Sequence, residues 1–246
     1  MESSIFSAMH ITSITLHPER FPDPSTYPFN LPAIRSTEHI VFKSNVTFFA
    51  GENGSGKSTL LRAMCRKCGI HIWAEDCWSR ANYNPYEESL FEYCDIAWAD
   101  GPKFGAFFSA ETYEHMTRMI DVWAAGDPRL LDYFGGKSLL EQSHGESFMS
   151  FFRSRYTIEG VYFLDEPETA LSPKRQLLFV KLLEELGRDG HAQFFIATHS
   201  PILLSTPDAA ILSFDRSPVQ PVPYDETEHY LVYRNFILGR EQNDKG

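Results

Sequence analysis

Residues 46–58 read VTFFAGENGSGKS, and this stretch decides the fold. Its first part, 46–50, is apolar enough to predict a short buried strand. Residues 51–58 then match the pattern G-x-x-x-x-G-K-[ST] in full. A helix with one apolar face is predicted from there over 59–68. A glycine-rich turn between a strand and a helix predicts a loop that binds phosphate.

Each residue type in this loop suits a triphosphate. Glycines allow the tight turn that aims backbone N–H groups at phosphate oxygens. The N-terminus of the following helix adds a positive potential. Lys57 is expected to reach the β- and γ-phosphates, and the Ser58 hydroxyl is expected to bind Mg²⁺. The residues expected to contact the nucleotide are Asn53, Gly54, Ser55, Gly56, Lys57, Ser58 and Thr59.

An acid closes the apolar run 161–165 (VYFLD), and a second acid follows it. Side chains at the carboxyl end of a strand in an open α/β sheet emerge at the ligand crevice. Asp165 is expected to bind Mg²⁺, and Glu166 to orient or deprotonate the attacking water. Taken alone, such a pair is more often simply exposed to solvent. The phosphate loop earlier in the chain favours the catalytic interpretation.

A histidine follows the next apolar run, 193–198 (QFFIAT). A polar residue at a third strand end is placed to contact a γ-phosphate, which makes His199 a candidate catalytic residue beside Lys57 and Glu166. A histidine that stands alone, without other polar residues of a motif around it, is more often a structural residue than a catalytic one. The position of His199 after the acid pair favours the catalytic role.

Apolar runs and helix-like segments alternate along the whole chain. Such an order predicts a mainly parallel sheet covered by helices. The expected fold class is α/β: a P-loop NTPase fold with a mainly parallel sheet, an antiparallel edge formed by the strands before the phosphate loop, and an inserted helical subdomain. Besides the runs already named, strands are predicted at 10–17, 39–43, 104–109 and 210–214.

The expected domains are a nucleotide-binding α/β core at 1–69 and 158–246 and a helical subdomain at 70–157. The prolines of 18–32 predict a loop with extended character. A helix that Ser172 and Pro173 open is expected to end at Gly187. A last helix is predicted at 227–238, followed by a tail without structure.

The chain has 246 residues and a formal net charge of −11. An acidic surface disfavours non-specific binding to nucleic acid or anionic membrane. No segment approaches the ~18 apolar residues of a membrane span. A cytoplasmic protein without a transmembrane segment is therefore expected. The pair Cys65 and Cys68, with His71 close behind, leaves a small metal or redox site as the alternative to reduced thiols, the simpler interpretation.

The phosphate loop, DEP at 165–167 and THS at 198–200 occur in this order and together resemble the ABC-class ATPases. GENGSGKST resembles the Walker A motif, and VYFLDEPE resembles Walker B followed by the catalytic glutamate. ALSP at 170–173 resembles the D-loop, which contacts the partner subunit, and His199 resembles the switch histidine. The resemblance implies an ATPase that takes ATP and Mg²⁺.

The run QSHGE at 142–146 stands where this family carries its signature LSGGQ, with His144 and Glu146 departing from the pattern. The resemblance implies that Ser143 and Gly145 act from the start of a helix on nucleotide held by another copy. One chain carries one phosphate loop and one signature. A homodimer that closes around ATP is therefore the simplest assembly.

Two further family positions are less clear in this sequence. A glutamine is expected after the strand at 104–109, and Glu111 stands near that place. Tyr27 and Phe29 are candidates for stacking on adenine. No long heptad segment is present, so there is no coiled-coil arm. The chain most resembles small stand-alone bacterial ATPases near the SMC and DNA-repair side of the family.

The sequence supports more than one output for ATP hydrolysis. The leading interpretation is an ATP-controlled dimer linked to DNA repair or cellular defence, with nucleic acid as a candidate partner. The alternative is the energising subunit of a membrane transporter, which needs a separate membrane protein.

Overall fold

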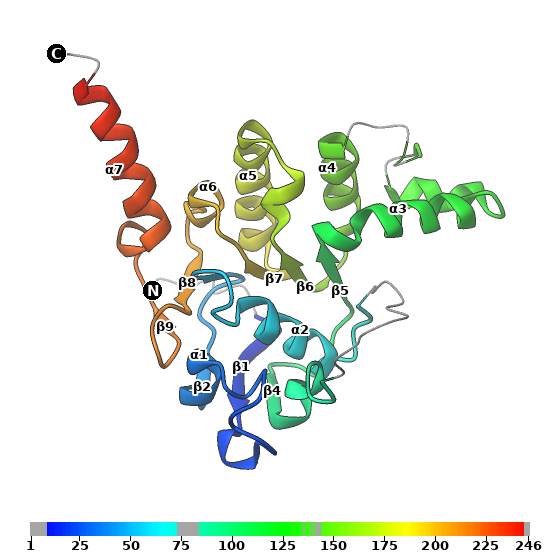
Figure 1. Cartoon of the computed structure of the whole chain (residues 1–246). Coiled ribbons are helices and arrows are strands. Elements are labelled where there is room, and N and C mark those ends of the chain that lie inside the picture. Colours follow the sequence, from blue (N-terminus) through cyan, green and yellow to red (C-terminus); the bar gives the residue numbers. More distant parts are fainter. Residues whose placement is uncertain (1–8, 73–83, 135, 139, 141–143, 244–246) are drawn as a thin grey trace, which may run out of the picture.

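The computed structural model describes residues 9–72, 84–134, 136–138, 140 and 144–243. These residues form two β-sheets with helices around them (Figure 1). The strands are β1 (Ile11–Leu16), β2 (His39–Val41), β3 (Val46–Ala50), β4 (Cys94–Trp98), β5 (Gly105–Ser109), β6 (Gly160–Asp165), β7 (Ala192–Ala197), β8 (Ala210–Ser213) and β9 (Gln220–Pro221). The α-helices are α1 (Pro32–Ser36), α2 (Lys57–Lys67), α3 (Ala110–Ala124), α4 (His144–Arg155), α5 (Pro173–Asp189), α6 (Pro201–Leu204) and α7 (Glu228–Asn243).

The larger sheet has the strand order β5-β6-β7-β3-β8-β9 among the described residues. Every neighbouring pair in it is parallel except β8 and β9, which are antiparallel. This confirms the expected α/β class with a mainly parallel sheet. The strands before the phosphate loop differ from expectation. Instead of forming the edge of this sheet, β1 and β2 form a separate antiparallel sheet with β4.

Side chains alternate between the two faces of the large sheet, and each face has its own apolar core. On β6, Tyr162 and Leu164 pack in one core with residues of α4 and α5. Val161 and Phe163 pack in the other core with residues of α2 and of the three-stranded sheet. Figure 1 shows this arrangement, with α3, α4 and α5 on one side of the sheet and α2 on the other.

A buried glutamine joins the two sheets. Gln193 of β7 is fully buried. Its Oε1 accepts hydrogen bonds from the backbone N–H of His10 at 3.1 Å and of Ile11 at 2.7 Å. Its Nε2 donates to the Ile11 carbonyl at 2.9 Å. A buried amide is stable only when its donors and acceptors are paired, and β1 supplies these partners.

Two helices end later than the sequence indicates. Helix α5 runs to Asp189, and Gly190, with φ 74°, takes the left-handed position after it. Gly187, the predicted end, serves another purpose, because a Cβ there would lie 2.9 Å from Val46 Cγ2. Its missing side chain lets the helix pack against β3. Helix α7 continues to Asn243 because Arg, Glu and Gln favour helices.

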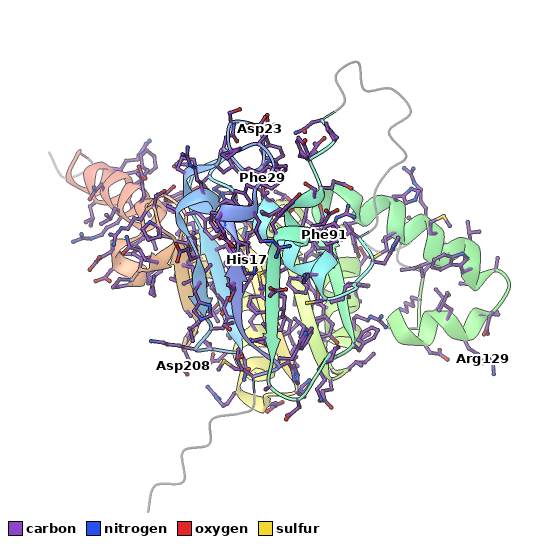
Figure 2. All side chains as sticks on the ribbon, turned by 90° about the horizontal axis from the view of Figure 1, so that it is seen from below. His17, Asp23, Phe29, Phe91, Arg129 and Asp208 are labelled. Atoms are coloured by element: carbon purple, nitrogen blue, oxygen red, sulfur yellow. The ribbon has the colours of Figure 1, made fainter. Side chains whose placement is uncertain are left out.

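The stretch 70–157 contains strands as well as helices. Both β4 and β5 fall within it and pair with β1 and β6 of the core. The helical part that follows begins at Ala110 with α3 and extends away from the sheets, and Arg129 marks its outer end in Figure 2. The division into a core and a helical subdomain stays a prediction.

The predicted loop at 18–32 also contains short helical turns, at Pro18–Arg20 and at the start of α1. Proline fits the first turn of a helix, where its missing N–H costs nothing. None of the helices in the described part of the chain is both long and apolar enough to cross a bilayer.

Candidate active site

The loop between β3 and α2 has the backbone that a phosphate cradle needs. Gly56 precedes α2 with φ 106°, and a Cβ there would lie 3.2 Å from Leu31 Cδ1. Gly54 has φ 78°, yet no atom lies within 4 Å of the position that its Cβ would take. Backbone conformation therefore requires glycine at both positions. At Gly54 the loop also leaves open space in front of the chain.

Lys57 lies at the centre of this loop. Its side chain is 4% exposed, and its Nζ donates to the carbonyls of Gly51 at 2.6 Å and Glu52 at 2.9 Å. Burial lowers the pKa of Lys57, while four surrounding carboxylates oppose that shift. These carboxylates belong to Glu166, Asp215, Asp165 and Glu168. A buried ammonium among acids is well placed to neutralise a polyanion.

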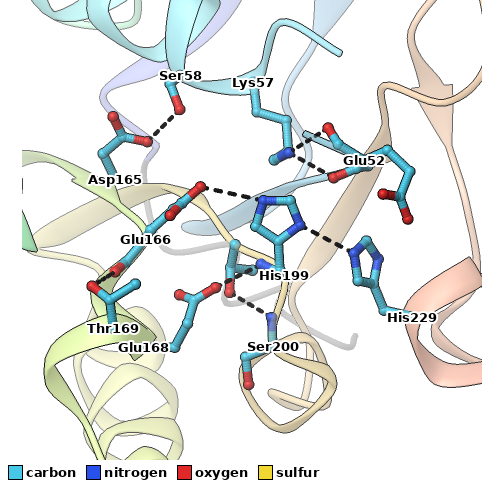
Figure 3. Close-up of polar contacts among 12 residues, drawn as sticks. Glu52, Lys57, Ser58, Asp165, Glu166, Glu168, Thr169, His199, Ser200 and His229 are labelled. Carbon is cyan, nitrogen blue, oxygen red and sulfur yellow. Dashed lines mark hydrogen bonds and ion pairs between the residues drawn. The ribbon is translucent and has the colours of Figure 1, made fainter. Parts of the chain in front are cut away.

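The two predicted metal ligands meet across the loop. Ser58 Oγ donates to Asp165 Oδ1 at 2.6 Å, and Arg62 approaches Asp165 Oδ2 at 3.3 Å (Figure 3 draws the first contact). Burial raises the pKa of Asp165, and the contacts with Ser58 and Arg62 pull in the opposite direction. The strand end of β6 therefore holds a buried carboxylate against the first turn of α2.

Glu166 has an unusual backbone. Its φ is 49°, in the left-handed region that few residues other than glycine adopt. Its N–H donates to the Ala197 carbonyl at 2.9 Å, and its own carbonyl accepts from the Thr169 hydroxyl at 2.8 Å. Such conformations occur where surrounding bonds fix them, and they cluster at functional sites. The side chain is turned toward β7 as a result.

His199 faces Glu166 from the end of β7. Its Nε2 lies 3.2 Å from Glu166 Oε1, and its backbone N–H donates to Glu168 Oε1 at 2.6 Å (Figure 3). On the other side of the ring, Nδ1 lies 3.1 Å from Nε2 of His229 on α7. Burial, and then the charge of Lys57, lowers the pKa of His199, which favours the neutral form of the ring.

Three residues of the site escaped the sequence analysis. Glu168 stands in the quoted run DEPE but received no role. Asp215 accepts from the Glu52 N–H at 2.7 Å and so holds the loop. It follows the apolar run 210–214, which is the same signal that marks Asp165. No sequence pattern marks His229 as a site residue. It lies 30 residues after His199, and only the fold brings the two rings together.

The described part of the predicted signature lies on a different helix from the one that the phosphate loop precedes. Gly145 is in the first turn of α4, which packs on the face of the sheet opposite α2. Ser143 lies outside the described residues. Glu111 is the second residue of α3, and Ser109 at the end of β5 pairs with Asp165.

The two candidates for stacking on adenine, Tyr27 and Phe29, differ in their exposure to solvent. Phe29 is fully buried and packs against Phe21, Tyr86 and Tyr93, so it is a core residue and the stacking prediction for it is wrong. Tyr27 is 37% exposed, and its hydroxyl lies 2.9 Å from Thr59 Oγ1. It borders a pocket of about 270 Å³ together with Ser58, Thr59, Arg62, Arg66 and Glu87.

The cysteine pair has poor chemistry for a metal or redox site. Cys65 is fully buried, and burial raises the pKa of its thiol. Burial also raises the pKa of Cys68 to about 12. Within the described ranges, no group of three or more His, Cys, Asp or Glu is arranged to hold a metal ion. Thiols of this kind stay protonated at pH 7.

Two polar atoms of the site fit a bound triphosphate. Ser55 Oγ in the loop is buried without a hydrogen-bond partner in the described part of the chain, and His199 Nε2 is buried 3.2 Å from the Glu166 carboxylate. Buried polar groups are normally paired. Phosphate oxygens accept hydrogen bonds, and both atoms are able to donate. Together with the open space at Gly54, this donor set fits a nucleotide triphosphate, and the Ser58–Asp165 pair offers oxygen ligands that suit Mg²⁺.

The fold and the arrangement of the phosphate loop and strand-end residues are those of a P-loop ATPase domain of the ABC type. Two family models match parts of the chain. The family described as "AAA domain, putative AbiEii toxin, Type IV TA system" matches residues 139–205, and the family described as "AAA domain" matches residues 29–69. The matched parts contain the phosphate loop, the acid pair and the histidine of the site. No curated protein matches the sequence.

Solved structures show the same fold at low sequence identity. An SMC head bound to the C-terminal winged-helix domain of ScpA is 14% identical with a TM-score of 0.54, covering 87% of this chain and 98% of that one. CbiO1 from Clostridium perfringens, part of the ABC transporter complex cbiONQ, is 16% identical with a TM-score of 0.52, covering 94% and 97%. The chain is thus similar to SMC heads and to transporter ATPase subunits, and it has the fold that they share.

Proposed function

We propose that this protein binds ATP with Mg²⁺ and hydrolyses it at the carboxyl ends of β3, β6 and β7. One observation carries the proposal. Lys57 after β3, Glu166 after β6 and His199 after β7 converge on one crevice, because these three strands are neighbours in a parallel sheet. The hydrogen-bond donors of the loop and the carboxylates of Asp165 and Glu166 therefore face the same space.

Each side chain has a role that its contacts support. Lys57 leaves the carbonyls of Gly51 and Glu52 to donate to the β- and γ-phosphates. Glu166 accepts a hydrogen bond from the attacking water, and His199 donates from Nε2 to the γ-phosphate. Ser58 and Asp165 would hold Mg²⁺, which supplies positive charge to the phosphate oxygens. Tyr27, whose hydroxyl contacts Thr59 of the nucleotide-binding loop, would stack on adenine.

The site is completed by a second copy of the chain. Helix α4, which carries Gly145, and helix α2, which follows the loop, pack on opposite faces of one sheet. The signature therefore acts on nucleotide in a neighbouring copy, with both copies related by a two-fold axis. ATP bridges the two surfaces and favours closure, while ADP lacks the bridging phosphate. The expected assembly is a homodimer in the cytoplasm.

Binding and turnover test the catalytic part. We would measure affinity for fluorescent ATP and phosphate release with Lys57→Ala. The matched control is Lys43→Ala, which removes an exposed lysine after β2. Loss of binding or turnover in the first variant alone supports the proposal. Equal steady-state hydrolysis in both variants would overturn it.

Mixing two inactive variants tests the shared site. Lys57→Ala and Ser143→Arg each disable both sites of their own homodimer. In a mixed dimer, one site receives both substitutions and the other receives neither. If the two sites act independently, mixing should restore about a quarter of wild-type turnover, since half of random dimers are mixed. No recovery despite confirmed mixing would contradict the two-copy site.

The output of hydrolysis is proposed to be cellular defence, with a DNA-linked role as the second candidate. The family description that names a putative toxin supports defence. Induced expression should then slow growth of the host in wild type and not in Lys57→Ala. ATP-dependent retention on DNA by a hydrolysis-blocked variant would favour the DNA-linked role. Co-purification of a membrane protein would instead favour the transporter alternative.

A further inference from the structure

Two histidine rings meet at the back of the candidate active site. His199 Nδ1 and His229 Nε2 are 3.1 Å apart, and the ring planes are inclined by 61°. The opposite nitrogen of His199 faces Glu166 at 3.2 Å. Figure 3 shows the ring of His199 between Glu166 and His229. Each ring nitrogen of His199 therefore has a neighbour: Glu166 lies beside Nε2, and His229 of α7 lies beside Nδ1.

The chemistry of the catalytic side decides where the proton of His199 must be. A carboxylate and a phosphate are both acceptors, so Nε2 has to be the protonated nitrogen if His199 is to contact either of them. A neutral imidazole then has only a lone pair at Nδ1. The contact with His229 can form only if His229 Nε2 carries a proton and donates it to that lone pair.

The first turn of α7 holds His229 in place. The preceding Thr227 is buried, its hydroxyl donates to the Tyr224 carbonyl at 2.7 Å, and its carbonyl accepts from the Leu231 N–H at 3.1 Å. His229 also borders a cavity of about 370 Å³ with Ala50 and Asp215, which flank the start of the phosphate loop. His229 therefore lies on the first turn of α7, beside the start of the phosphate loop.

We infer that His229 is a positioning residue for ATP hydrolysis: it donates from Nε2 to His199 Nδ1 and so keeps the proton of His199 on the nitrogen that faces Glu166. The inference rests on the proposed function. It gives α7, which no motif includes, a direct part in the site. Without His229, His199 samples the other tautomer, in which Nε2 is an acceptor and faces acceptors.

Three variants separate this role from a packing role. His229→Leu removes the donor and keeps an apolar body. His229→Gln restores an amide N–H donor. His115→Leu is the matched control, since His115 is exposed on α3. Each variant is compared with wild type in kcat, in KM for Mg-ATP and in thermal unfolding. Long-range ¹⁵N–¹H NMR spectra report the tautomer of His199, and the His199→Gln variant assigns its signals.

We expect His229→Leu to lower kcat about 10- to 100-fold with KM within about twofold, in line with other residues that orient a functional side chain. His229→Gln should recover most of that loss, and His115→Leu should behave as wild type. In the spectra, His199 should carry its proton on Nε2 in wild type and populate the Nδ1 tautomer in His229→Leu.

Two results would overturn the inference. One is a His199 tautomer that is the same in wild type and in His229→Leu. The other is an equal loss of kcat in the Leu and Gln variants, which indicates packing alone. The NMR experiment needs no turnover. If wild type proves unable to hydrolyse ATP, the proposed function fails, while the tautomer measurement still decides whether His229 orients His199.

Discussion

Ser58 Oγ lies 2.6 Å from Asp165 Oδ1, so the first turn of α2 and the end of β6 are joined by a hydrogen bond at the centre of the site. Their positions in the sequence are 107 residues apart. A serine that donates to a buried carboxylate leaves its lone pairs free for another partner. Under the proposed function, this contact holds the two oxygen ligands of Mg²⁺ side by side.

A pair of glycines tests whether the loop faces a ligand. Gly54 and Gly69 have similar φ values, 78° and 72°, and both would place a Cβ in open space. Substitution of either by alanine should therefore cost a similar ~1 kcal/mol in unfolding free energy. Only Gly54→Ala should weaken nucleotide binding, by about tenfold. Urea unfolding and fluorescent-ATP titration measure the two effects, and equal affinities would contradict a phosphate cradle at Gly54.

Glu166→Gln should stall the protein as an ATP-bound dimer. Glutamine keeps the shape of the side chain but cannot take a proton from water, so turnover should fall ~100-fold or more while binding persists. Light scattering after gel filtration with Mg-ATP should show a dimer. The control is Glu185→Gln on an exposed face of α5. A purely monomeric Glu166→Gln protein in saturating Mg-ATP would speak against the closed dimer.

His199 should contribute to the pH dependence of stability. Burial, and then the charge of Lys57, lowers its pKa from 6.5, although the Glu166 carboxylate opposes this. As the pH falls, His199 therefore takes up a proton more readily in the unfolded chain than in the folded protein. Stability should fall as the pH drops below about 6.5 and through the lowered pKa. Thermal unfolding between pH 5 and 8 should show a weaker decline in His199→Gln. Parallel curves for the two proteins would contradict this origin.

Gln193→Leu should destabilise the fold without altering the catalytic groups. The substitution leaves the N–H groups of His10 and Ile11 without their acceptor in a buried place. Each such group costs about 1–3 kcal/mol, so a loss of about 2–6 kcal/mol in unfolding free energy is expected. Gln220→Leu on the exposed edge strand β9 is the control and should change stability by less than about 0.5 kcal/mol. Urea unfolding distinguishes them.

The residues of the candidate site could be proposed from the sequence because their positions follow local rules. Asp165 and His199 each lie next to an apolar run, Lys57 lies in the motif that follows one, and parallel strands bring such positions to one edge. The structure places Lys57 among the carboxylates of the site and puts His199 beside Glu166.

Partners that depend on packing were beyond the sequence. Nothing in the proline-rich loop distinguishes Phe29 from Tyr27, since only tertiary contacts bury one ring and leave the other exposed. A glycine usually indicates a helix end, but Gly187 lies inside α5, where glycine is needed because the helix approaches Val46 closely. His229 reaches the site only because α7 begins beside β8. Such contacts are set by the global fold and leave no periodicity to detect.

The two separate cores of the large sheet have a consequence for how substitutions combine. Tyr162 and Leu164 belong to one packing system, while Val161 and Phe163 belong to the other. Energetic coupling requires shared neighbours, so double substitutions within one system should be non-additive, while those across the sheet should nearly sum. The helix that carries Gly145 and the helix that carries Lys57 are therefore free to vary in sequence independently, even if both serve the proposed reaction.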